Sequence, residues 1–181
     1  MPVGLENAGV SRHFYRADMK NWVRRPLPQQ EEINVVFFRG VSTDALTRGL
    51  LAARRLPLAY GKGEDWSVIM HHMLSWEGGD HDLVPYGQLC RHGGELAVFA
   101  TEPCVAKAHA PAFEYYRDGQ LITHFSFEDP SRPGGEDPHM LVKALTAAKV
   151  IGPEAAIGDD DDERIVQAIA ELFSLPELDM P

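Results

Sequence analysis

The hydrophobic pattern of this chain predicts five β-strands separated by polar turns. The run "INVVFFR" at 33–39 is almost continuously apolar and rich in strand formers, which is typical of a strand buried on both faces. Further strands are predicted at 66–76 and 95–103, and two more within "AFEYYRDGQLITHFSFEDP" at 112–130. The stretch 56–66, "LPLAYGKGEDW", is interpreted as a loop.

The stretch 112–130 is predicted to be a β-hairpin. Asp118-Gly119 separates two strand-like runs, and both central residues of a type I′ turn need a positive φ. Counting outward from a two-residue loop pairs Arg117 with Gln120 and Tyr116 with Leu121, and then Tyr115 with Ile122 and Phe113 with His124. This pairing places Phe113, Tyr115, Ile122, Ser126 and His124 on one face.

The periodicity of the remaining segments predicts four helices. A helix in 42–56 has Ser42 or Thr43 as its N-cap, and a short helix in 83–94 begins near Pro85. A helix in 139–152 is predicted with Asp137 as N-cap and Pro138 at the first helical position. The last helix, "DDERIVQAIAELFSL", has an apolar stripe at helical spacing, formed by Ile165, Ile169, Leu172 and Phe173.

The order of these elements predicts an α+β domain. We expect a mostly antiparallel sheet of about five strands, with two to four helices packed mainly on one face. The domain is predicted to span 33–175, between an N-terminal arm and linker at 1–32 and a frayed tail at 176–181. In the arm, "HFYRADMKNWVRR" has the pattern of an amphipathic helix with Phe14, Met19, Trp22 and Val23 on its apolar side. The arm either docks on the domain or serves a partner.

Composition and charge narrow the functional class. The 181 residues carry a formal net charge of -10, with a pI near 5.2, which argues against nucleic acid and leaves room for a basic protein partner. The sequence contains no signal-peptide pattern and no membrane-spanning apolar run, so a soluble cytoplasmic protein without membrane contact is expected. Cys90 and Cys104 are expected to be reduced thiols.

Four stretches resemble one protein family. They are "VVFFRGVSTDAL", "WSVIM", "RHGGELAVF" and the hairpin "FEYYRDGQLITHFSFEDP", followed by a helix pair. Together they resemble an uncharacterised domain-of-unknown-function family of small proteins common in high-GC Gram-positive bacteria. The resemblance covers roughly residues 33 to 152. It implies a single soluble domain and assigns no catalytic residue.

The polar residues do not form a recognisable metal or cofactor motif. The densest group is His71, His72, Asp80, His81 and Asp82, but adjacent histidines in a strand point to opposite faces and cannot share a metal ion. The acidic run 159–163 lacks the spacing of a calcium loop, and no glycine-rich segment has the pattern of a phosphate loop. A metal site could still form if either His71 or His72 joined His81 and Asp82 across the turn, but scattered structural or surface histidines are the preferred interpretation. We therefore expect no metal and no cofactor.

Two functions remain open from the sequence. The preferred interpretation is a non-enzymatic protein-interaction or regulatory domain, such as an immunity-type protein, because no catalytic set converges. Cys90 lies close to His92 in the sequence, but a buried helix cysteine is favoured over a thiolate nucleophile. The alternative is a small-molecule enzyme or binding protein. Its pocket would be lined by Trp66, Trp76, Phe113 and Tyr115, with His72 or His124 as the acid or base. Neither the partner nor the oligomeric state follows from the sequence.

Overall fold

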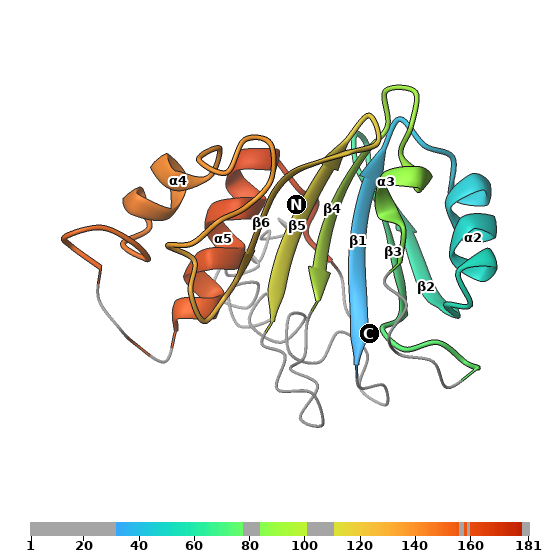
Figure 1. The fold of residues 1–181 in the computed structure, drawn as a ribbon, viewed down its shortest axis with the longest axis horizontal. Helices are drawn as coiled ribbons and strands as arrows, with labels where there is room; N and C mark the ends of the chain where they lie inside the picture. The colour runs from blue at the N-terminus through green and yellow to red at the C-terminus, as the bar shows by residue number, and fades with distance from the viewer. Residues whose placement is uncertain (1–31, 78–83, 101–110, 156–157, 159, 179–181) are drawn as a thin grey trace, which may run out of the picture.

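The computed structural model describes residues 32–77, 84–100, 111–155, 158 and 160–178. These residues form six strands and four helices (Figure 1). The strands are β1 (Ile33–Arg39), β2 (Pro57–Lys62), β3 (Ser67–His72), β4 (Glu95–Ala100), β5 (Ala112–Arg117) and β6 (Gln120–Ser126). The helices are α2 (Thr43–Ala52), α3 (Tyr86–Leu89), α4 (Val142–Ala147) and α5 (Asp161–Phe173). The predicted α+β class is confirmed, with six strands instead of five.

The six strands make one sheet in the order β2-β3-β1-β4-β5-β6, and every neighbouring pair is antiparallel. The apolar strand β1 lies inside the sheet between β3 and β4, and residues 33–38 are buried. The continuous apolar run predicted this position, because both faces of β1 are covered.

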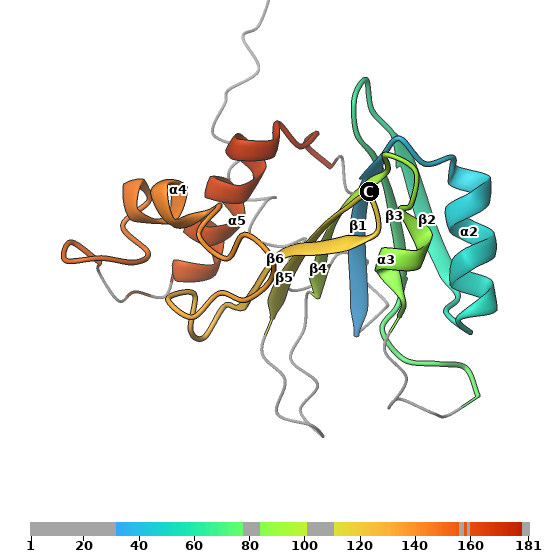
Figure 2. The same ribbon diagram turned by 45° about the horizontal axis from the view of Figure 1, so that its top comes forward.

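The helices lie on both faces of the sheet, whereas the sequence had suggested one face. In Figures 1 and 2, α2 and α3 are on one side of the sheet, and α4 and α5 are on the other. The connections β1-α2-β2 and β3-α3-β4 each join parallel strands across one intervening strand. The first connection moves toward one edge of the sheet and the second toward the other, and β1 and β3 also point in opposite directions. Because these two reversals cancel, the same crossover hand puts α2 and α3 on the same face of the sheet. The C-terminal helices cover the other face.

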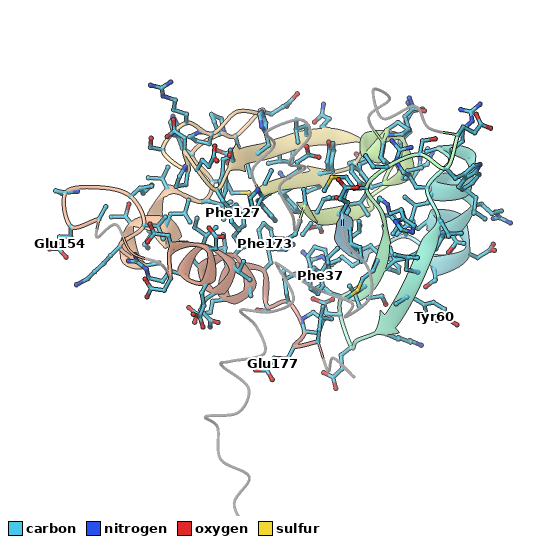
Figure 3. All side chains as sticks on the ribbon, turned by 90° about the horizontal axis from the view of Figure 1, so that it is seen from below. Phe37, Tyr60, Phe127, Glu154, Phe173 and Glu177 are labelled. Atoms are coloured by element: carbon cyan, nitrogen blue, oxygen red, sulfur yellow. The ribbon has the colours of Figure 1, made fainter. Side chains whose placement is uncertain are left out.

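Alternation along the strands builds a separate core on each face. Val36, Phe38, Leu46 and Leu50 belong to the core beneath α2 and α3. The larger core lies beneath α4 and α5, and its principal members include Val35, Phe37, Phe99, Phe113, Leu145, Ile165, Ile169 and Phe173. Figure 3 shows Phe37, Phe127 and Phe173 in the layer between α5 and the sheet.

The hairpin forms at the predicted turn, but its register changes after two pairs. Asp118 and Gly119 have φ values of 49° and 86°, as a type I′ turn requires. Arg117 pairs with Gln120 and Tyr116 with Leu121, as predicted. A β-bulge then leaves Ile122 as the extra residue, so Tyr115 pairs with Thr123 instead of Ile122.

Because of the bulge, the faces predicted for the residues of β6 beyond Ile122 are wrong. His124 pairs with Glu114, not with Phe113, and its side chain is exposed. Phe125 takes the position opposite Phe113 and belongs to the larger core. Because side chains alternate along a strand, one inserted residue exchanges the two faces for every residue beyond it.

A glycine segment covers the outer edge of β6. The N–H of His124 donates to the Gly134 carbonyl at 3.0 Å, and the Gly134 N–H donates back at 2.9 Å. Gly135 has a φ of 107°, and a Cβ atom there would come within 2.5 Å of the Ile122 carbonyl oxygen. The absence of a side chain at position 135 therefore allows the loop to close on the strand.

Three predicted elements have different bounds in the structure. Residues 57–62 form β2 instead of a loop; Pro57 and a register shift are features that an edge strand tolerates. The strand predicted over 66–76 is limited to β3. The helix predicted over 139–152 spans only Val142–Ala147, and Asp137 is not its N-cap; the Asp137 N–H donates to the Ile122 carbonyl instead.

The helices α2 and α5 form close to their predicted positions. The Ser42 hydroxyl accepts a hydrogen bond from the Ala45 N–H at 3.1 Å, which confirms Ser42 as the N-cap of α2. In α5, Ile165, Ile169 and Phe173 are buried as predicted. Leu172 was assigned to the same apolar stripe, but it is 46% exposed.

Within the part of the chain that the structure describes, no helix has the length and apolarity needed to cross a membrane. The amphipathic segment predicted in the N-terminal arm lies outside the described residues.

Candidate functional site

Three of the four aromatic residues proposed to line a pocket instead surround Phe173. The Phe173 ring centroid lies 6.2 Å from that of Trp66, 6.1 Å from that of Phe113 and 4.6 Å from that of Tyr115. The indole N–H of Trp66 donates to the Phe173 carbonyl at 2.9 Å. The space between these aromatic side chains is therefore occupied by Phe173, the last residue of α5.

The fourth aromatic residue, Trp76, lies elsewhere on the molecule. Its side chain is 54% exposed, and its backbone N–H donates to the Arg54 carbonyl just after α2. It does not belong to the core that contains Trp66, Phe113 and Tyr115. The four residues thus do not line a common pocket.

The two histidines proposed as acid or base also lie apart. His72 ends β3 and His124 lies on the edge strand β6, with β1, β4 and β5 between the two strands. Four interstrand spacings amount to about 19 Å. His124 is exposed beside Gly134, and the His72 carbonyl accepts a hydrogen bond from His71. The structure does not bring these side chains together or beside the three core aromatic residues.

A polar cluster at one end of the sheet uses the hydroxyl of Tyr115. Arg39 donates to both carboxylate oxygens of Glu95, at 3.1 and 3.0 Å, and to Asp65 at 3.0 Å. The Arg39 guanidinium also stacks 4.5 Å from the centre of the Trp66 ring, and Tyr115 donates to Glu95. Burial opposes ionisation of Glu95, but the hydrogen bonds from Arg39 and Tyr115 hold its pKa below the ordinary value. Through Glu95, this cluster joins the end of β1 to the start of β4 and to Tyr115 of β5.

A buried hydrogen-bond chain lies on the opposite face of the sheet. His71 Nδ1 is 2.8 Å from the His72 carbonyl, and its Nε2 is 2.8 Å from the Tyr86 hydroxyl oxygen. Because the carbonyl can only accept, Nδ1 carries the proton and Nε2 accepts from Tyr86. The Tyr86 oxygen in turn accepts from the Asn34 side-chain amide at 2.8 Å. The chain therefore runs in one direction from Asn34 to the His72 carbonyl.

Burial fixes the protonation states in this chain. Desolvation lowers the pKa of His71 to about 4 and raises the pKa of Tyr86 above its ordinary value. Both rings are neutral near pH 7, and both use their polar atoms to join β1, β3 and α3. This arrangement anchors the short helix α3 to the sheet, and Asn34 within an otherwise apolar strand was the sequence signal for it.

The other chemical candidates from the sequence are placed as follows. Cys90 is buried, and desolvation raises the pKa of its thiol, which opposes formation of a nucleophilic thiolate. His71 points into the core, whereas Asp80, His81 and Asp82 lie outside the described residues. Among the described residues, no three His, Cys, Asp or Glu side chains converge as metal ligands would.

A surface groove lies between α4 and α5. Its volume is about 860 Å³. Its walls combine small apolar side chains with the polar side of α5, namely Ala144, Ala147, Ala148, Asp160, Glu163, Arg164, Gln167, Ala168, Glu171 and Leu172. The alanines leave room for another chain to approach the α4 backbone closely, and exposed Leu172 adds an apolar contact at the end of α5.

The α5 wall of the groove is acidic. Glu163, Gln167 and Glu171 follow each other at four-residue intervals, which places them in one row along the helix. Eight residues of helix span about 12 Å, so the two carboxylates lie about that far apart along the axis. Asp160, Asp161 and Asp162 lie at the start of the helix, where Asp160 and Asp161 pair with Arg164.

Arg164 also lines the groove and connects its two walls. Its guanidinium donates to the Lys149 carbonyl at 3.1 Å and to Asp161, so it joins α5 to the residues just after α4. These contacts hold the guanidinium charge beside Asp161, and the neighbouring row of Glu163, Gln167 and Glu171 carries two carboxylates. Sequence reasoning missed the groove because its alanines and acidic residues come from two helices whose packing the sequence did not show.

Comparison of the chain with protein-family models, curated proteins and solved structures gives no match. The resemblance to an uncharacterised bacterial family stays a prediction, and the function has to be inferred from the arrangement of the side chains.

Proposed function

We propose that this protein is a non-enzymatic interaction module that binds a basic amphipathic helix of another protein in the groove between α4 and α5. The observation that carries the proposal is the combination of an alanine-lined groove of about 860 Å³ with a row of acidic side chains on one wall. Amphipathic helices bind proteins by laying an apolar face into such a groove. A regulatory or immunity-type role, in which an acidic protein binds a basic partner protein, fits this surface.

Charge supports this choice of partner. The chain carries a net charge of -10, so its field attracts a basic protein and accelerates the encounter at low salt. Lys or Arg residues repeated every four positions on a partner helix would match the spacing of Glu163 and Glu171. The small side chains of Ala147 and Ala148 would accept apolar residues on the adjacent side of that helix.

The small-molecule alternative receives less support from the packing. Phe173 fills the space between three of the aromatic residues that it requires, and the fourth, Trp76, lies elsewhere on the surface. His72 and His124 lie on well-separated strands.

The test measures binding of a fluorescently labelled model helix by anisotropy. The probe is a designed peptide with Leu and Lys at helical spacing, and a peptide of the same composition in scrambled order is the control. We expect the ordered peptide to bind more tightly and its affinity to fall as salt rises. Combining Glu163→Gln with Glu171→Gln is expected to weaken binding about tenfold, because two exposed ion pairs contribute roughly 0.5–1 kcal/mol each.

A matched variant separates the groove from the overall charge. Glu64→Gln combined with Glu128→Gln changes the net charge by the same amount at exposed positions outside the groove lining. Ala147→Trp tests the apolar side, because the indole would fill the groove. Equal weakening by both charge-neutralising pairs, or binding unaffected by Ala147→Trp, would contradict the proposal.

A further inference from the structure

We propose that residues 12–25 of this same chain occupy the α4–α5 groove, so that the protein carries its own competitor for the basic helix. The competition rests on the proposed function, whereas the docking of the arm stands on its own observations.

The first observation is the uneven distribution of charge along the chain. Residues 12–25 contain five Lys or Arg and one Asp, a net charge of +4 in a chain whose total is -10. The other residues therefore carry -14 together. The most basic stretch of the sequence is thus attached to an acidic body, and attraction between them acts within one molecule.

The second observation is the matching spacing of charges. Arg12, Arg16, Lys20 and Arg24 recur every four residues, as do Glu163, Gln167 and Glu171 in the groove wall. In a helix, each of these rows would rise about 6 Å per step. Rows with the same rise can place several basic side chains opposite the two carboxylates at once.

The third observation is the apolar side of the same segment. Met19 and Trp22, which belong to the apolar side predicted from the sequence, follow Tyr15 at the helical spacings i+4 and i+7. In a helix, this row of three residues would lie beside the basic row. The groove offers a corresponding apolar surface in Ala147, Ala148 and Leu172. The order of basic and apolar rows on the segment thus has a counterpart in the acidic and apolar walls of the groove.

The connection to the domain is long enough to bring the segment near α5. A second hollow, of about 320 Å³, is lined by both Phe37 of β1 and Glu171 of α5, which places β1 beside that part of the helix. Phe37 lies five residues along the strand from Glu32, a distance of about 17 Å. The six residues 26–31, "PLPQQE", span up to about 20 Å when extended.

The test uses zero-length carbodiimide cross-linking of the full chain at low salt, followed by peptide mapping. Lys20 is the single lysine among residues 1–31, so its cross-links report the position of the arm. We expect Lys20 to couple to Glu163 or Glu171 within the monomer, and the products to disappear in high salt. Coupling of Lys20 mainly to carboxylates outside the groove, or only between two copies of the chain, would overturn the inference.

A charge-reversal pair tests the same contact through binding. Arg16→Glu combined with Arg24→Glu should abolish the Lys20 cross-link and increase affinity for the labelled model helix about three- to tenfold. The matched control is Arg48→Glu combined with Arg132→Glu, which makes the same charge change at exposed sites outside the groove. An equal gain from this control would show a general effect of charge and overturn the competition.

The two proposals fail in different ways. If the model helix binds the wild-type groove but Lys20 does not cross-link there, the arm inference fails and the proposed function stands. If Lys20 cross-links to the groove but the helix does not bind even after Arg16→Glu and Arg24→Glu, the arm docks and the proposed function fails.

Discussion

The contrast between Phe173 and Leu172 gives the sharpest test of how α5 packs on the sheet. The sequence pattern assigned both residues to the same apolar stripe. In the structure Phe173 contacts Trp66, Phe113 and Tyr115, and it is 9% exposed, whereas Leu172 is 46% exposed. Replacing each residue by alanine therefore removes very different amounts of buried surface from neighbouring positions of one helix.

The expected magnitudes follow from the burial. Removing a buried phenylalanine side chain costs about 3–5 kcal/mol, because the apolar transfer energy is lost and a cavity remains. Phe173 lies at the end of α5 and keeps some exposure, so we expect Phe173→Ala to lower the free energy of unfolding by about 3 kcal/mol. For Leu172→Ala we expect at most about 1 kcal/mol, since a half-exposed side chain loses little on truncation.

Urea unfolding followed by tryptophan fluorescence measures both effects. With a denaturant slope of about 2 kcal/mol per molar urea, the midpoints of the two variants should differ by about 1 M. Circular dichroism of each variant before unfolding checks that α5 remains helical. Midpoints that shift equally, or a larger loss for Leu172→Ala, would refute the assignment of Phe173 to the core.

Three further predictions concern the buried polar chain and the glycine loop. Desolvation gives His71 a pKa of about 4 in the folded state against an ordinary 6.5, so the unfolded chain binds more protons between these values. Stability should therefore fall by up to roughly 3 kcal/mol as pH drops from about 6.5 towards 4, and His71→Gln should flatten this dependence in urea midpoints measured at several pH values. Tyr86→Phe removes the hydroxyl that links His71 to Asn34 and should cost about 1–3 kcal/mol in thermal or urea unfolding; an unchanged midpoint would contradict the hydrogen-bond chain. Gly135→Ala should destabilise more than Gly152→Ala in the same assay, because both glycines have positive φ but only position 135 would press a Cβ atom against backbone.

Local features of the candidate site were partly accessible from the sequence. The apolar periodicity identified α5, and the acidic start of α5 was visible as a charge run. The groove itself was not visible, because it requires the position of α4 against α5. The contact of Arg164 with the Lys149 carbonyl joins residues fifteen positions apart, and periodicity within one helix carries no information on such contacts.

The sequence by itself determined the elements that are set by residues close together in the chain. Asp118-Gly119 set the hairpin turn because few residues accept positive φ, Ser42 capped α2, and the apolar run of β1 required burial on both faces.

Only the tertiary structure decided which residues face one another. The bulge at Ile122 reversed the orientation of His124, since a shift of one residue exchanges the two faces of a strand. The division of the helices between the two faces of the sheet followed from the strand order and the crossover hand. The position of Phe173 among three aromatic side chains that are distant from it in the sequence followed from that division. Such relations depend on how separate elements pack, and the period of a single element does not encode them.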